Sequence, residues 1–497
     1  MATITEFDPP GLPADAVAEA DPKRWLALAV IAVAQLVVVL DASIVNIALP
    51  SAQHALHISA ANRQWIVTAY TLSFGSLLLL GGRIADYMGR KRMFIIGLLG
   101  FAGASALGGS AVNAPMLFGA RALQGAFGAL LAPAALSLIT VTFTEVKERS
   151  TAFGVYGAIA GGGAAIGLIL GGVLTQYASW RWTLFVNVPI AGLTALAALP
   201  VVRDSRAHGN TSYDIPGTLT VTAGLVALVY GFTRAAQNGW AAGMTLTFLA
   251  IAIVLLVVFA VIEVRSKNPL LPVRVILERN RGGSYFGSFM VGAGLLGMFL
   301  FLTYYFQGNL GYSALKSGFA FLPFSGGIIL AATVSSKLLP RTGPRVLMTS
   351  GFAAAALGML WLSRIGPHTG YVAHVLPAEL LISLGMGIAF VAMSSTALFG
   401  VGAHDAGVAS ALVNTTQQVG GSLGTALLNT VAASATATYL ATRVHTRAAI
   451  DAAQVHGYTV GFLIGAGCLV IASLSAAVLV RATRADLANM SVEVAPV

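Results

Sequence analysis

Fourteen long apolar stretches constrain this chain more than any other feature of its sequence. A helix that crosses a bilayer needs about 20 mostly apolar residues, and such stretches fall at 25–49, 62–82, 93–112, 116–140, 151–175, 183–202, 215–235, 244–264, 283–307, 317–338, 346–365, 375–399, 408–433 and 458–480. Only 9% of the 497 residues are charged, whereas soluble domains carry about 25%. We therefore predict an all-α polytopic membrane protein.

Lys and Arg are unevenly distributed between the predicted loops. With a cytoplasmic N-terminus, the segments on that side hold 20 of these residues and the outer segments hold 7. Because Lys and Arg accumulate on the cytoplasmic side of membrane proteins, both termini are predicted to be cytoplasmic. The net charge of +10 then reflects topology, and we expect no nucleic-acid partner.

The spans are predicted to form six, two and six helices. We expect an N-terminal tail at 1–24, a six-helix bundle at 25–202, linkers with two extra helices at 203–282, a second six-helix bundle at 283–480 and a C-terminal tail at 481–497. Paired six-helix halves with a site near the midplane between them are a known transporter plan.

A carboxylate lies inside the first apolar stretch. Asp41 in LDASIVNIALP follows four apolar residues, and a charge within a bilayer costs a few kcal/mol or more. Such residues usually face a water-filled cavity and act on protons or ions. The alternative is a carboxyl close to one end of the span that reaches the interface. Asn46 is a nearby polar partner and a candidate for the cavity wall.

The loop GRIADYMGRKRMF, between the second and third stretches, is the most specific local signal. Gly89 permits a tight turn, and Asp86 can pair with Arg90 or cap a neighbouring helix. We predict a gating loop around Asp86, Gly89 and Arg90. The alternative is an ordinary basic cytoplasmic loop.

An arginine lies inside the fourth stretch, in RALQGAFG. An intramembrane Arg is expected to be functional and to have an acidic partner, for which Asp41 is a candidate. A nearby permanent cation favours the ionised carboxylate, and its withdrawal favours protonation. Arg121 is thus a candidate for proton coupling. Gln124 could share the same polar pocket and is also a candidate for the substrate cavity. A structural Arg that satisfies backbone carbonyls is the alternative.

The fifth stretch is rich in glycine. Gly163, Gly167 and Gly171 recur at intervals of four and Gly172 follows, a spacing that lets helices approach closely. These residues form either a rocking interface between the halves or an ordinary packing face.

These motifs resemble, in kind and in order, those of the major facilitator superfamily. Fourteen spans, together with SWRWTLFVNVPI at 179–190, DIPG at 214–217 and VASALVNTTQQVGGSLGTAL at 408–427, resemble its fourteen-helix drug:proton antiporter family, the EmrB/QacA type. The resemblance covers nearly all of 23–481. It implies proton-driven export of small, often amphipathic or cationic compounds from a bacterium, with the acidic role at Asp41 and the proton-relay role at Arg121. The resemblance also assigns the gating loop to Gly82, Asp86, Gly89, Arg90 and Lys91.

One position departs from the family pattern. Leu168 follows Gly167 where the family usually has proline, and a proline would bend the helix. Leu168 removes that bend, which bears on the coupling and the direction of antiport that the resemblance implies.

A second carboxyl and several aromatic residues complete the candidate site. Glu379 opens the twelfth stretch, and lies either in the cavity, where it would attract cations, or in water at the outer interface. We group it with the proton-coupling residues. Tyr70 and Tyr304 are candidates for the substrate cavity because aromatic faces attract organic cations.

The predicted function is proton-coupled multidrug efflux by alternating access, at a bacterial plasma (inner) membrane. The alternative is a dedicated exporter of one metabolite, antibiotic, lipid or siderophore. The sequence has no phosphate loop and no nucleophile–base constellation, so we expect neither an enzyme nor an ATPase. We expect no cofactor or metal, a proton gradient as the energy source, drug-like small molecules, protons and the lipid bilayer as partners, and a monomer.

Overall fold

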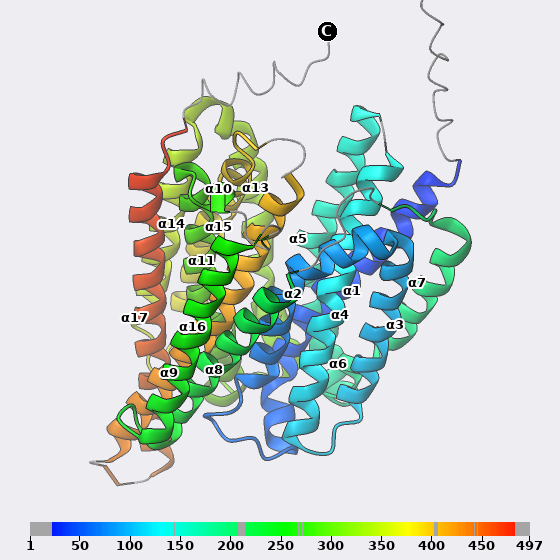
Figure 1. Cartoon of the computed structure of the whole chain (residues 1–497). Coiled ribbons are helices and arrows are strands. Elements are labelled where there is room, and N and C mark those ends of the chain that lie inside the picture. The colour runs from blue at the N-terminus through cyan, green and yellow to red at the C-terminus, as the bar shows by residue number, and fades with distance from the viewer. Residues whose placement is uncertain are drawn as a thin grey trace, which may run out of the picture.

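The computed structural model describes residues 22–143, 145–206, 214–266, 269, 273–401, 406–441, 443–444 and 446–482. Within these ranges all regular secondary structure is helical (Figure 1). The two predicted tails lie almost wholly outside the described residues.

The first six predicted spans correspond to seven helices, because the sixth span is broken at Val186. Their bounds are α1 (Arg24–Ala55), α2 (Trp65–Met88), α3 (Arg90–Gly109), α4 (Ala114–Thr142), α5 (Val146–Tyr177), α6 (Trp182–Phe185) and α7 (Asn187–Val201). The next two spans are α8 (Ile215–Asn238) and α9 (Gly243–Arg265), followed by the short α10 (Val273–Ile276).

The last six spans include two short stretches of π-helix. Their bounds are α11 (Arg279–Tyr304), η1 (Tyr305–Asn309), α12 (Ala314–Ala320), α13 (Leu322–Thr342), α14 (Pro344–Leu362), η2 (Tyr371–Val375), α15 (Leu376–Ala397), α16 (Ala406–Ala441) and α17 (Arg447–Leu479). Helices α16 and α17 extend well beyond the predicted spans and occupy most of the connection between them.

Thirteen helical segments in the described part of the chain are long and apolar enough to cross a membrane. The remaining long helix is α16, whose 36 residues include Asn414, Gln417 and Gln418. These polar side chains lower its hydropathy and line a cavity. The expected all-α membrane fold is confirmed, and α16 supplies the fourteenth long span.

Glycine permits the closest helix packing in both halves of the chain. Gly81 and Gly125 bring α2 against α4, and Gly292 and Gly420 bring α11 against α16, so that an added Cβ would overlap the backbone of the neighbouring helix. Small residues at helix contacts allow the van der Waals packing on which membrane helices depend.

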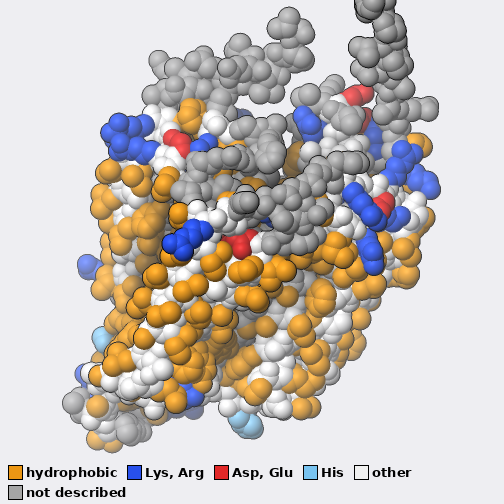
Figure 2. Space-filling model, viewed as in Figure 1, with side chains coloured by type: hydrophobic (Ala, Val, Ile, Leu, Met, Phe, Trp, Pro, Cys, Tyr) orange, Lys and Arg blue, Asp and Glu red, His pale blue; other side chains and the backbone are white. Residues whose placement is uncertain are grey.

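The described chain begins and ends at the same end of the helix array, at the top of Figure 1. We call this end the termini side and the opposite end the far side. Hydrophobic side chains cover most of the lateral face in Figure 2, and Lys and Arg gather towards the termini side.

The extra pair of helices lies against both halves. Helix α8 packs on α9, on α2 and on α16. The hydroxyl of Thr233 in α8 accepts hydrogen bonds from Gln64 Nε2 at 3.0 Å and from Trp65 Nε1 at 3.1 Å. Thr430 Oγ1 of α16 donates to the Phe232 carbonyl at 2.9 Å. Helix α9 has only 11% of its most apolar window buried, as expected for a helix that faces lipid.

Candidate functional site

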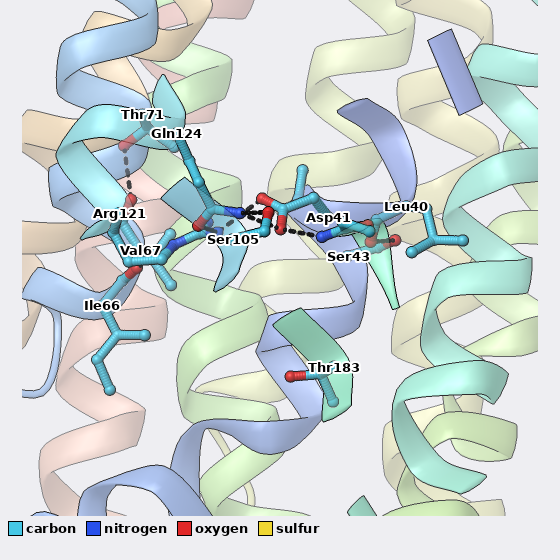
Figure 3. A network of polar contacts seen from close by, with 12 residues as sticks. Leu40, Asp41, Ser43, Ile66, Val67, Thr71, Ser105, Arg121, Gln124 and Thr183 are labelled. Carbon is cyan, nitrogen blue, oxygen red and sulfur yellow. Dashed lines mark hydrogen bonds and ion pairs between the residues drawn. The ribbon is translucent and has the colours of Figure 1, made fainter. Parts of the chain in front are cut away.

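A buried ion pair joins α1 to α4. Asp41 Oδ2 accepts a hydrogen bond from Arg121 Nη1 at 2.6 Å (Figure 3), and the two residues are 0% and 1% exposed. A pair buried to this degree repays its desolvation only when its remaining polar atoms are also hydrogen-bonded. Neither charge faces lipid or the end of a span, so interfacial placement of Asp41 is excluded for this conformation.

Two amide side chains and one backbone carbonyl supply further hydrogen bonds to the ion pair. Arg121 Nε donates to the Ile66 carbonyl at 3.0 Å. Asp41 Oδ1 accepts from Gln124 Nε2 at 3.0 Å and from Asn187 Nδ2 at 2.8 Å. Gln124 also accepts from Arg121 at 2.7 Å and donates to Ser105 Oγ at 2.6 Å. The network therefore holds α1, α3, α4 and α7 together around one carboxylate.

Two members of this network were not identified from the sequence. Asn187 lies within SWRWTLFVNVPI, and an amide inside an otherwise apolar span was a usable signal. Ser105 carried none, because a serine in a helix usually bonds to its own backbone. Asp41, Arg121 and Gln124, all predicted site residues, are brought together.

A large cavity lies between the two halves. Its volume is about 670 Å³, and its walls come from α1, α2, α4 and α5 on one side and from α15 and α16 on the other. Gly82, Arg83 and Asp86 line its termini-side end. Aromatic rings, aliphatic side chains and neutral amides form most of the rest, a lining suited to an amphipathic small molecule. They include Gln35, Tyr70, Phe74, Tyr156, Phe390, Asn414, Gln417 and Gln418.

Tyr70 separates the cavity from the ion pair. It lines the cavity, and the Arg121 guanidinium lies over its ring, 4.5 Å from the centroid. A second cavity of about 10 Å³ is lined by Arg121 and Thr183, a volume near the minimum for one water molecule. Arg121 therefore lines the small cavity directly and contacts the large cavity only through the Tyr70 ring.

Comparison with known proteins identifies the chain. A family model described as Major Facilitator Superfamily matches residues 31–425. The chain belongs to this superfamily. It is a multi-pass membrane transporter with bacterial relatives, as the motifs led us to expect.

Individual relatives extend over most of the transporter. Puromycin resistance protein pur8 of Streptomyces alboniger is 51% identical and the match covers 93% of this chain and 92% of the relative. Multidrug efflux pump LfrA of Mycolicibacterium smegmatis is 32% identical, and the match covers 82% of this chain and 81% of LfrA. A solved bacterial homologue of the lysosomal transporter Spinster, described as inward-facing and unoccupied, superposes with a TM-score of 0.66 at 16% identity, covering 94% of this chain and 98% of that one.

Only one of the four residues predicted for the substrate cavity lines it in this transporter, namely Tyr70. Gln124 belongs to the ion-pair network, and Asn46 Nδ2 donates to the Ala42 carbonyl of its own helix at 3.2 Å. Tyr304 lies on the far side against Arg63. An aromatic ring within an apolar span does not reveal which face of its helix borders the cavity.

The predicted gating loop makes a tight turn on the termini side. Asp86 Oδ1 accepts from Arg90 Nε at 2.8 Å, and Gly89 between them has φ +108°. The Arg90 backbone N–H donates to the Ser205 carbonyl at 2.9 Å. In this conformation the loop is therefore attached to the segment that follows α7.

The other two residues of the loop prediction are also placed. Gly82 lies against Pro133 of α4, and a Cβ added at Gly82 would be 3.3 Å from the Pro133 Cβ. Lys91 Nζ donates to the Leu199 carbonyl of α7 at 2.6 Å. The loop thus contacts several elements of the N-terminal half, and its gating role stays a prediction.

The four glycines of α5 divide between two neighbours. Gly163, Gly167 and Gly171 lie against α1 within the same half, and Gly172 lies against Leu315 of α12 in the other half. An added Cβ at Gly172 would come within 2.7 Å of the Leu315 Cα. The spacing of four therefore marks packing on α1, and only Gly172 touches the interface between the halves.

Glu379 lies in neither of the predicted positions. It is 0% exposed at the start of α15 and does not line the large cavity. Its Oε2 accepts a long hydrogen bond from the Tyr371 hydroxyl, at 3.5 Å. Within the described part of the chain, its Oε1 has no hydrogen-bond partner. Both the cavity position and the wet interface are wrong for this conformation, because the carboxyl is enclosed within the C-terminal half.

Proposed function

We propose that this transporter is a proton-coupled exporter of small amphipathic, often cationic compounds, which works by alternating access. The observation that carries the proposal is the separation of a drug-sized cavity from a sealed carboxylate–guanidinium pair by one aromatic side chain, Tyr70. A substrate in the cavity and a proton on Asp41 would then influence one another through Arg121 and Tyr70, without sharing a site.

The conformation fits one stage of such a cycle. The cavity is bordered by termini-side residues, while the far side is closed by contacts between the halves, including the Gln307 side chain on the Ile47 carbonyl at 2.9 Å. With both termini in the bacterial cytoplasm, this state would face inward. The small cavity beside Arg121 and Thr183 supports access to the pair from the far side.

Alternating access then follows from opposite charge preferences. Protonation of Asp41 from outside would weaken its bond to Arg121 and favour release of the substrate, and deprotonation to the inside would restore the pair and permit rebinding. Proton and substrate can shift the conformational equilibrium only through different affinities for its states. Here the difference would arise from the charge of the buried network.

The names of the relatives support export of antibiotic-like compounds, and experiment must decide how many compounds this transporter exports. LfrA is named a multidrug pump, and pur8 is named for resistance to a single antibiotic. The 51% identity to pur8 favours the dedicated exporter as the second candidate. A substrate panel that gives one tight ligand and no dye efflux would select it.

The deciding experiment uses Asp41→Asn in proteoliposomes with an imposed pH gradient. We expect ethidium transport driven by the gradient to be abolished, while the variant remains folded. The matched control is Asp214→Asn, since Asp214 caps α8 through the Gly217 N–H and Asn caps equally well. Retained gradient-driven transport in Asp41→Asn would rule out the proposed role of this carboxylate.

A further inference from the structure

An arginine on the far side packs against aromatic rings. Arg63, in the connection between α1 and α2, is only 9% exposed. Its guanidinium carbon lies 4.1 Å from the ring centroid of Tyr304 and 5.9 Å from that of Tyr458. Its Nε donates to Asn429 Oδ1 at 3.0 Å. Within the described residues, no carboxylate forms an ion pair with Arg63.

All three partners of Arg63 belong to the opposite half of the transporter. Tyr304 ends α11, Asn429 lies in α16 and Tyr458 lies in α17. We call these three side chains the aromatic cage. A cation inside it is stabilised by π faces and by one amide oxygen, a combination that recognises organic cations in general.

The aromatic cage is anchored within its own half. The Tyr458 ring stacks on Phe301, with centroids 5.6 Å apart. The Tyr304 hydroxyl is buried and has no hydrogen-bond partner among the residues that the structure describes, although Tyr hydroxyls usually find one when buried. Tyr458 therefore has a packing partner that does not depend on Arg63, and Tyr304 offers a hydroxyl that a ligand could bind.

We propose that the aromatic cage is a release site for organic cations bearing an ammonium or guanidinium group, and that Arg63 occupies it when the far side is closed. The inference rests on the proposed export function. Opening of the far side would carry Arg63 away with the N-terminal half and leave the cage free for a departing substrate. Closure would return Arg63 to the cage, displace the cation and prevent it from binding again.

A binding experiment tests the cage without transport. Purified full-length Arg63→Ala would be heated in the presence of increasing tetramethylammonium chloride or methylguanidinium chloride, with sodium chloride as the ionic-strength control. We expect a saturable rise in thermal stability for Arg63→Ala and none for the wild type, whose cage is filled. Adding Tyr304→Leu to the variant should weaken the binding by about 2- to 30-fold, the range of one cation–π contact.

The matched control is Arg443→Ala. Arg443 also stacks on a tyrosine, 3.4 Å from the centroid of Tyr439, but it is exposed and is not enclosed by other rings. This variant should show no saturable stabilisation. An Arg63→Ala protein that responds no more than Arg443→Ala would overturn the proposal, as would a response that survives Tyr304→Leu. If Arg63→Ala does not fold, Arg63→Gln takes its place.

A transport measurement addresses release. In proteoliposomes, Tyr304→Leu should slow efflux of the cationic dye ethidium by about 2- to 30-fold and leave efflux of the neutral dye Nile red nearly unchanged. Equal slowing of both dyes would refute a cation-specific release site. Failure of gradient-driven transport in the wild type would instead count against the proposed function, because the thermal experiment requires no transport.

Discussion

The buried pair of Asp41 and Arg121 makes a quantitative prediction for a double-mutant cycle. Asp41→Asn removes the anion and leaves the guanidinium buried without a counter-charge, and Arg121→Gln does the converse. Asp41 Oδ2 and Arg121 Nη1 are 2.6 Å apart, and both side chains are almost fully buried. Each single variant should therefore lose about 3–5 kcal/mol in its free energy of unfolding. The double variant buries no charge at the site.

The double variant should therefore be less destabilised than the sum of the single variants, by about 3 kcal/mol, the upper end for residues in contact. The measurement is denaturant unfolding of the purified protein in detergent, followed by tryptophan fluorescence and circular dichroism. Additivity to within about 0.5 kcal/mol would refute the reasoning. All three variants should lack gradient-driven efflux, and transport by the double variant would contradict the proton-coupling role.

A second pair on the same transporter calibrates the cycle. Asp86 and Arg90 are 2.8 Å apart, but their side chains are 36% and 15% exposed. The corresponding Asp86→Asn and Arg90→Gln cycle should give a coupling of about 0–1 kcal/mol, as for surface ion pairs. Similar coupling in both cycles would mean that burial does not set the strength of the Asp41–Arg121 pair.

Three further predictions concern the N-terminal half. The Arg24 side chain donates two hydrogen bonds of 2.8 Å to Glu148, which hold the pKa of Glu148 below its usual range. Glu148→Gln should therefore be less thermally stable than the wild type at neutral pH. The difference should disappear as the pH falls through the lowered pKa of Glu148. Gly171→Ala should lower the thermal midpoint because the new Cβ would come 2.6 Å from a backbone oxygen of α1, whereas Gly157→Ala, with nothing within 4 Å, should not. Gly89→Ala places a side chain at φ +108° and should destabilise by about 1–2 kcal/mol, measured by denaturant unfolding.

The helical architecture was predictable because a bilayer leaves few alternatives for a chain of this hydropathy. Long apolar runs must close their hydrogen bonds internally, which helices do. The polar core was partly predictable for a related reason. A charge such as Asp41 or Arg121 is too costly in a span to remain without a function or a partner, so the two could be matched before their positions were known.

Position around a helix was the part that the sequence could not provide. Tyr304 and Tyr70 carry the same ring in similar surroundings, yet one contacts Arg63 on the far side and the other lines the cavity. The position of Glu379 could not be predicted either, because its depth in the protein depends on how α15 packs against its neighbours. In α16 the side-chain amides lower the hydropathy of the span, and the structure explains them because they line the cavity.

The position of α8 has a consequence for how the molecule can move. Helix α8 is hydrogen-bonded to Trp65 of α2 through Thr233 and to Thr430 of α16 through the Phe232 carbonyl, so it spans the boundary along which the two halves would separate on the far side. The two halves cannot separate at this boundary while α8 stays hydrogen-bonded to both of them. If the far side opens as proposed, one of these attachments would break, at a cost of about 1 kcal/mol per hydrogen bond. Helices α8 and α9 would then move with the half to which α8 stays bonded.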